Sequence, residues 1–101
     1  MRNILDNLPI DRLADFCHRQ KITELALFGS ILRDDFAQDS DIDMLVTFSP
    51  ESCHSLFDLA LMQQELKALL GRDVDIVEKA ALRNPFRRAH ILNTMKVIYA
   101  T

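Results

Sequence analysis

The sequence predicts a small α/β protein of the α+β type, in which helices flank one small mixed β-sheet. Two observations lead to this fold class. Stretches with apolar residues at helical spacing alternate along the chain with short runs of β-forming residues. Apolar residues make up 49% of the chain, with only 2 Gly and 3 Pro, a composition that excludes disordered and collagen-like chains. A length of 101 residues supports one core, so we expect a single domain over residues 1–101.

The first half of the chain predicts a helix, a strand, a helical turn and a second strand. Helical spacing of apolar residues follows Pro9, and proline suits the first turn of a helix. The apolar run 22–28 predicts a strand that ends at Gly29, and residues 30–36 predict a short helical turn. Residues 41–48 are rich in β-formers and predict the second strand, which the following Ser-Pro pair ends.

The second half of the chain predicts two helices and two strands. Residues 56–70 form a long apolar helix, which Gly71 ends as a C-terminal stop. Residues 73–79 predict a third strand, residues 85–95 a helix opened by proline, and residues 96–100 a short fourth strand. Apolar positions nearly encircle the first of these helices, which is more than one buried face requires. Part of that helix therefore suits an interface, either with a partner or with a second copy of the chain.

Charge and cysteine content narrow the functional class. The formal net charge is −3, whereas a general nucleic-acid binder usually carries a dominant basic field, so direct nucleic-acid binding is not expected. Residues 79–101 hold five basic side chains and no acid, which indicates a solvated helix face or a contact with an acidic partner or RNA. Two cysteines are too few for a disulfide framework, and no stretch is apolar enough to span a membrane. We therefore expect a cytoplasmic protein without membrane contact.

Two neighbouring carboxylates in the predicted strand 41–48 form the first candidate site. Asp41 and Asp43 are two residues apart, so in a strand both side chains point to the same face. Asp75 has the same setting in the predicted strand 73–79. Adjacent carboxylates repel each other unless a cation neutralises them, and their hard oxygens suit Mg²⁺. The alternative is that one or two of these acids only cap or solvate a strand end.

The Gly-Ser pair at the end of the first predicted strand is the second candidate site. Gly29 lets the backbone approach a ligand closely. Ser30 can then open a helical turn whose N–H groups face an anion. In this order the Gly-Ser turn follows one strand, and Asp-x-Asp lies on the next strand. The order would place N–H groups that bind phosphate beside a metal site. This order predicts a triphosphate with Mg²⁺ as the ligand.

The run over residues 27–46, LFGSILRDDFAQDSDIDMLV, resembles the signature of the minimal nucleotidyltransferases of the DNA polymerase β superfamily. That signature is Gly-Ser, a spacer, Asp-x-Asp, and a third acid on a later strand. The resemblance covers nearly the whole chain and implies the polymerase-β-like nucleotidyltransferase fold. One departure is Asp34, where many relatives carry glycine. The positions that match the signature are Gly29, Ser30, Asp41, Asp43 and Asp75.

The resemblance implies an enzyme that transfers a nucleoside monophosphate from an NTP, with ATP as the expected donor, to an acceptor hydroxyl. Asp41 and Asp43 would hold two Mg²⁺ ions, or Mn²⁺ in their place, as the catalytic metals. Asp75 would complete the catalytic metal site nearest the acceptor. The Gly-Ser pair at residues 29–30 would bind the β- and γ-phosphates. Arg33 would help to neutralise phosphate charge, or else form a salt bridge with a nearby aspartate.

Small stand-alone proteins that resemble this chain are typically encoded beside an all-helical HEPN-domain ribonuclease, with which they form a toxin–antitoxin pair. The resemblance therefore implies AMP transfer to a tyrosine of a HEPN toxin, which would silence it, and a complex of the two proteins. Two alternatives stay open: an antitoxin that only binds, and nucleotidyl transfer to an RNA end or a small molecule. The predicted strands argue against this chain being a HEPN ribonuclease itself.

Overall fold

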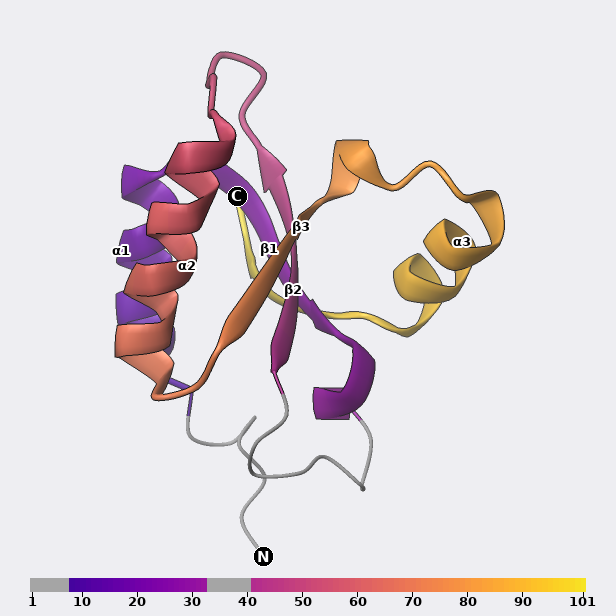
Figure 1. Ribbon diagram of the computed structural model, residues 1–101, viewed down its shortest axis with the longest axis horizontal. Helices are drawn as coiled ribbons and strands as arrows, with labels where there is room; N and C mark the ends of the chain where they lie inside the picture. Colours follow the sequence, from indigo (N-terminus) through magenta and orange to yellow (C-terminus); the bar gives the residue numbers. More distant parts are fainter. Residues whose placement is uncertain (1–7, 33–40) are drawn as a thin grey trace, which may run out of the picture.

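Helices and strands alternate along the part of the chain that the computed structural model describes, residues 8–32 and 41–101 (Figure 1). The α-helices are α1 (Ile10–Arg19), α2 (Leu56–Leu70) and α3 (Pro85–Thr94). The strands are β1 (Ile22–Phe28), β2 (Ile42–Phe48), β3 (Val74–Glu78) and β4 (Lys96–Ala100). Two short 3-10 helices follow strands, η2 (Gly29–Leu32) and η3 (Lys79–Ala81).

These elements lie where the sequence predicts them, with differences at their ends. Helix α1 begins directly after Pro9. The predicted turn over residues 30–36 begins as η2, and its remainder lies outside the described residues. Strand β2 begins at Ile42, so Asp41 lies just before the strand and not inside it. Helix α3 ends one residue earlier than predicted, because the chain turns there into β4.

The four strands form one mixed sheet in the order β3-β2-β1-β4. Strand β1 runs antiparallel to β2 and β4, whereas β2 and β3 are parallel and are connected through α2. This topology confirms the predicted α+β fold with a small mixed sheet. In the register of the sheet, Asp43 of β2 lies opposite both Asp75 of β3 and Phe28 of β1. The end of β1 therefore meets the two acid-bearing strands at one place.

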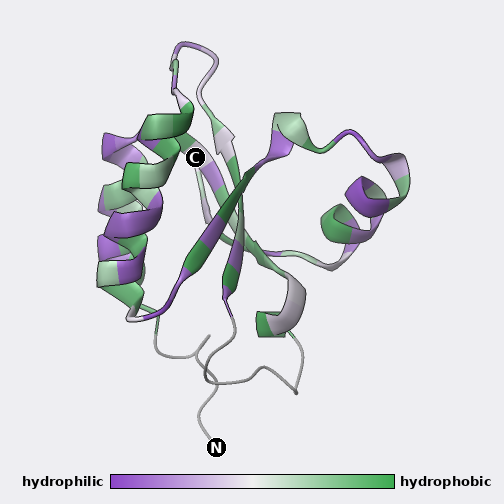
Figure 2. Ribbon diagram, viewed as in Figure 1, coloured by the Kyte–Doolittle hydropathy of each residue, from purple (hydrophilic) through white to green (hydrophobic). Residues whose placement is uncertain are grey.

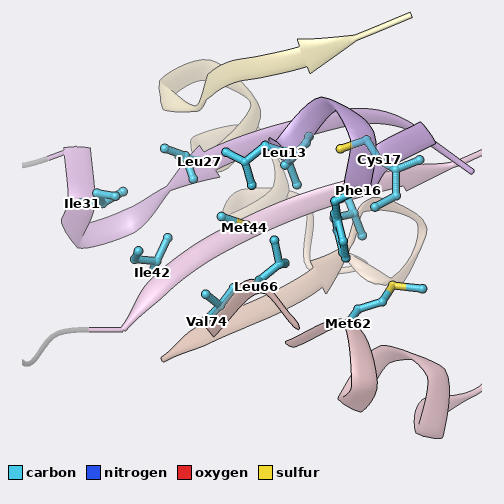
Figure 3. Close-up of a cluster of buried hydrophobic side chains, with 13 residues drawn as sticks. Leu13, Phe16, Cys17, Leu27, Ile31, Ile42, Met44, Met62, Leu66 and Val74 are labelled. Carbon is cyan, nitrogen blue, oxygen red and sulfur yellow. The ribbon is translucent and has the colours of Figure 1, made fainter. Parts of the chain in front are cut away.

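Helices α1 and α2 cover one face of the sheet and enclose the main apolar core (Figures 1 and 3). Leu13 and Phe16 of α1 are almost completely buried, and they pack in one cluster with Met44 of β2 and Leu66 of α2. Hydrophobic colouring follows the strands through the centre of the molecule (Figure 2). Burial of these apolar side chains is the dominant stabilising contribution to such a fold.

Helix α2 is more apolar than its packing requires. Only Met62 and Leu66 are buried, while Leu56 and Phe57 at its start are 85% and 72% exposed. The predicted surplus of apolar surface on this helix is confirmed. Neither α2 nor any other helix within residues 8–32 and 41–101 is both long and apolar enough to cross a membrane.

Helix α3 lies on the opposite face of the sheet, over a second and smaller apolar cluster (Figure 1). The alternation of side chains along each strand separates the two clusters, because successive residues point to opposite faces. The cluster under α3 consists of Ala26, Phe28, Leu45, Leu82 and Ile91. On this side of the sheet, at the start of β3, Asp75 is exposed.

Candidate active site

Asp43 and Asp75 lie side by side on the face of the sheet that carries α3. Ile42 and Met44 flank Asp43 along β2 and are fully buried in the main core, so the side chain of Asp43 points to the other face. Asp75 is the direct partner of Asp43 on β3 and is exposed. Asp41 is also exposed, two residues before Asp43 at the start of β2. The structure thus brings the three predicted acids to one end of two parallel strands.

The electrostatic surroundings of Asp43 disfavour a negative charge. Partial burial raises the pKa of Asp43 above its ordinary value, and the negative charges of Asp75 and Asp41 raise this pKa further. The positive charge of Arg87 on α3 acts in the opposite direction. The site therefore concentrates negative charge that a bound cation would stabilise.

The side chains of this site offer the ligand chemistry of a hard divalent cation. The three carboxylates supply only oxygen ligands, which Mg²⁺ and Mn²⁺ favour. Within the described ranges, no three acid, histidine or cysteine side chains already converge as a metal-binding group. Mg²⁺ usually takes one or two carboxylates together with substrate phosphates, and not a cage made only of protein. The acids therefore fit an ion that binds together with a nucleotide.

Gly29 follows β1 directly and packs against Asp43. Its φ angle is +78°, in the left-handed region that favours glycine. A Cβ atom at this position would collide with the Asp43 carboxylate oxygen and would lie 3.4 Å from its Cγ. Both the backbone conformation and the space therefore require glycine. Ser30 comes next, half-buried in η2, so the predicted Gly-Ser pair lies directly beside the acids.

The remaining predicted phosphate ligand, Arg33, lies outside the described residues. The same holds for Asp34, at which the sequence departs from the signature. The geometry of the candidate site therefore comes from the end of β1, the first turn after it, and the starts of β2 and β3.

A cavity of about 500 Å³ opens beside Gly29, between the end of β1 and α3. This volume lies in the range of small-molecule sites. The lining residues on α3 recur every three or four positions, so they form one face of that helix. The cavity is lined by Phe28, Gly29 and Leu32 on one side and by Arg87, His90, Ile91 and Thr94 on the other.

Arg87 is a candidate that the sequence alone did not single out. The basic segment 79–101 is visible in the sequence, but its pattern does not tell which arginine faces the acids. The Nη1 atom of Arg88 donates hydrogen bonds to the carbonyl oxygens of Lys79, at 3.0 Å, and Leu82, at 3.4 Å. Arg88 therefore anchors α3 to the segment after β3. Arg87 instead lines the cavity, and its charge reaches Asp43.

Residues 10–98 match the family described as the nucleotidyltransferase domain, and this match includes the Gly-Ser turn and both acid-bearing strands. The chain belongs to this nucleotidyltransferase family. Among its relatives, the protein adenylyltransferase MntA of Thermococcus cleftensis is 40% identical over 63 residues, which span 62% of this chain and 62% of that protein. The family resemblance predicted from the sequence is confirmed.

Solved structures with the same fold support this assignment to the nucleotidyltransferases. A protein assigned as a minimal nucleotidyltransferase aligns with a TM-score of 0.74 and 30% identity, over 94% of both chains. A toxin–antitoxin structure with AMP-PNP aligns with a TM-score of 0.75 and 21% identity, over 93% of this chain and 75% of that one. A complex of a tri-AMPylated HEPN toxin with an MNT antitoxin from Shewanella oneidensis has a TM-score of 0.66 and 19% identity, over 91% and 70%.

Proposed function

We propose that this nucleotidyltransferase transfers AMP from ATP to a tyrosine hydroxyl of a HEPN-domain ribonuclease toxin and thereby neutralises it as an antitoxin. The observation that carries the proposal is the packing of Gly29 against Asp43, directly opposite Asp75 in the sheet. Support for the acceptor comes from a relative named as a protein adenylyltransferase and from a similar structure in which the HEPN toxin is AMPylated. A stable or transient complex with the toxin is part of the proposal.

In the proposed reaction, the tyrosine oxygen forms a bond to the α-phosphorus of ATP. The bond between that phosphorus and the bridging oxygen of the β-phosphate breaks, and pyrophosphate leaves. Asp75 is exposed beside Asp43 and would accept the hydroxyl proton. Asp41, Asp43 and Asp75 together would hold two Mg²⁺ ions, or Mn²⁺. When bound, these ions would supply positive charge to the attacking and leaving oxygens.

The phosphate end of ATP would bind at the turn after β1. Because Gly29 carries no side chain, the backbone at residues 29 and 30 is accessible beside the carboxylates, and its N–H groups would donate to the β- and γ-phosphates. The hydroxyl of Ser30 would add a further donor. Arg33 would contribute positive charge to the same phosphates. These contacts would orient the α-phosphorus toward the acids, where the acceptor enters.

The test is to mix this protein with the HEPN protein from its genomic neighbourhood, Mg²⁺ and each NTP in turn. We expect intact-mass measurement to show the toxin gaining AMP units, with ATP as the preferred donor. The modified toxin should stay inactive as a ribonuclease after the antitoxin is removed, because a covalent bond does not depend on continued contact. Asp43→Asn should lower the transfer rate by several orders of magnitude, since it removes one metal-binding charge.

Glu51→Gln is the matched control, because Glu51 is an exposed acid in the loop after β2. It should transfer AMP at the wild-type rate. If Asp43→Asn neutralises the toxin fully with no mass change, the protein is an antitoxin that acts by binding alone. If the AMP appears on RNA or a small molecule but never on the toxin, the acceptor in the proposal is wrong.

A further inference from the structure

Arg87 lines the cavity from α3, and its positive charge acts on Asp43 beyond the Gly29 wall. Asn84 caps α3, and its Oδ1 accepts hydrogen bonds from the backbone N–H groups of Phe86, at 3.0 Å, and Arg87, at 3.1 Å. This cap fixes the first turn of α3, and Arg88 anchors the same turn to η3. Arg87 is therefore held on a supported helix turn, with its side chain on the face that lines the cavity.

No hydrogen bond or ion pair within the described part of the chain occupies the Arg87 guanidinium, and the residue is exposed. Its five N–H donors are therefore available to a ligand. The opposite wall of the cavity begins at Gly29, where the backbone lies beside Asp43. A group bound between these walls would meet arginine on one side and a turn of backbone on the other.

Phosphate is the chemical group that this arrangement fits. Arginine presents a planar fork that matches two phosphate oxygens, and its charge does not depend on pH in the physiological range. A polyphosphate placed next to Asp43 and Asp75 would be repelled by their carboxylates. A cation on the far side of the phosphates offsets this repulsion. Among the described residues that line this cavity, Arg87 is the one whose side chain is permanently charged.

We propose that Arg87 is a phosphate-binding residue of the nucleotide site, and that α3 forms the wall of this site opposite the Gly29–Ser30 turn. The inference rests on the proposed function, because it assumes that the ligand is a nucleoside triphosphate. It adds a residue to the site that lies outside the Gly-Ser and Asp-x-Asp signature. The competing interpretation is that Arg87 acts only as a counter-ion that stabilises the folded acids.

The test measures binding of Mg²⁺ with AMP-PNP by titration calorimetry, and displacement of AMP-PNP by tripolyphosphate. Arg87→Gln should weaken AMP-PNP binding about 10- to 100-fold, as expected for the loss of a charged hydrogen-bonding partner. Displacement by tripolyphosphate should weaken by a similar factor, since this competitor shares only the phosphates. Arg87→Lys should recover part of the affinity, because it keeps the charge and loses the fork.

Arg83→Gln is the control, because Arg83 is exposed in the loop before α3 and does not line the cavity. It should bind AMP-PNP as the wild type does. Wild-type affinity in Arg87→Gln would overturn the inference and leave the proposed function intact. A second result would also overturn the inference: Arg87→Gln melts at a lower temperature without nucleotide but binds AMP-PNP with unchanged affinity. That combination is expected of a residue that acts only as a counter-ion. A wild-type protein that binds no Mg²⁺ with AMP-PNP would overturn the proposed function as well.

Discussion

At the residue scale, the site depends on Asp43, a carboxylate that the fold holds among other negative charges. It stands between two fully buried core residues of β2, opposite Asp75, and within reach of the charge of Asp41. Burial and both neighbouring acids raise the pKa of Asp43, and the positive charge of Arg87 acts against them. Like charges in such a position destabilise the metal-free fold. A bound cation relieves the repulsion. The same acids that lower the stability of the free protein therefore favour the binding of a cation.

This repulsion predicts how Asp43→Asn changes stability with pH in the absence of metal. The raised pKa means that ionised Asp43 destabilises the folded state, so the cost is present above the folded-state pKa and absent once the pH falls below the pKa of an unfolded aspartate. At about pH 7 the variant should be more stable by a few tenths to about 1 kcal/mol, because solvent screens this half-buried carboxylate. Urea unfolding in a chelator at about pH 7 and about pH 4 measures the difference.

The gain should shrink toward zero at the lower pH, and Glu51→Gln, which alters an exposed acid away from the site, should show no such trend. An equal gain at both pH values would mean that the asparagine stabilises the fold by packing, and that charge repulsion at Asp43 is negligible.

At the scale of elements, local capping motifs close both ends of α2. Only Met62 and Leu66 of this helix are buried. Its N-terminus is closed by a capping box, in which Ser55 Oγ accepts from the Asp58 N–H at 3.1 Å and Asp58 Oδ2 accepts from the Ser55 N–H at 2.9 Å. These hydrogen bonds to Ser55 also lower the pKa of Asp58. Gly71, with φ +72°, ends the helix in the left-handed conformation.

Ser55→Ala should therefore destabilise the protein by about 1 kcal/mol, because it leaves the N–H of Asp58 without its partner. Ser55→Asn is the matched control and should stay close to wild type, since asparagine is an equally good cap. Urea denaturation measures both. The transfer rate per folded molecule should not change in either variant, because α2 covers the face of the sheet away from the acids. A variant Ser55→Ala as stable as wild type would show that the capping box contributes little.

The sequence predicts the elements of this fold well, because each one has a local signal. Helical spacing, β-forming runs, Pro and Gly lie within the element or next to it, and strand alternation alone separates Asp43 from the buried Ile42 and Met44. Strand order and register have no local signal. Asp75 reaches Asp43 only because α2 crosses over and sets β3 parallel to β2. That packing depends on contacts between residues far apart in the chain.

Arg87 shows the same limit within one helix. Arg87 and Arg88 are adjacent and chemically identical, yet they point about 100° apart around the helix axis. Which of them faces the acids depends on how α3 is placed against η3, and the hydrogen bonds of Arg88 to Lys79 and Leu82 determine this. The basic segment is therefore visible in the sequence. The sequence does not show that Arg88 anchors α3 while Arg87 lines the cavity.

At the scale of the whole molecule, one face of the sheet packs the main core and the other face carries the candidate site. The face under α1 and α2 holds the main core, and the face under α3 holds a smaller cluster (Figure 1). The acids lie on the α3 side, where Asp41 and Asp75 are exposed and Asp43 is half-buried. Strand β2 belongs to both faces, since Met44 and Val46 pack in the main core and Leu45 packs in the smaller cluster. A ligand that binds the acids therefore acts on a central strand of the core. Binding there should stabilise the entire domain, and not only the residues that contact the ligand.

Mg²⁺ with ATP should therefore raise the melting temperature more than ATP alone, because the acids and the phosphates share the ions. With ligand at about 100 times its dissociation constant the stabilisation is about 2.7 kcal/mol, on the order of 10 °C for a domain of this size. Asp43→Asn should lose most of this increment in differential scanning fluorimetry. The same substitution should raise the melting temperature of the free protein at neutral pH, so its two effects have opposite signs. A substitution that lowers stability in general would lower the melting temperature both with and without the ligand. A substitution remote from the metal would change neither the melting temperature of the free protein nor the Mg²⁺-dependent increment. If Asp43→Asn keeps the full Mg²⁺-dependent increment, the acids at β2 are not where the metal binds.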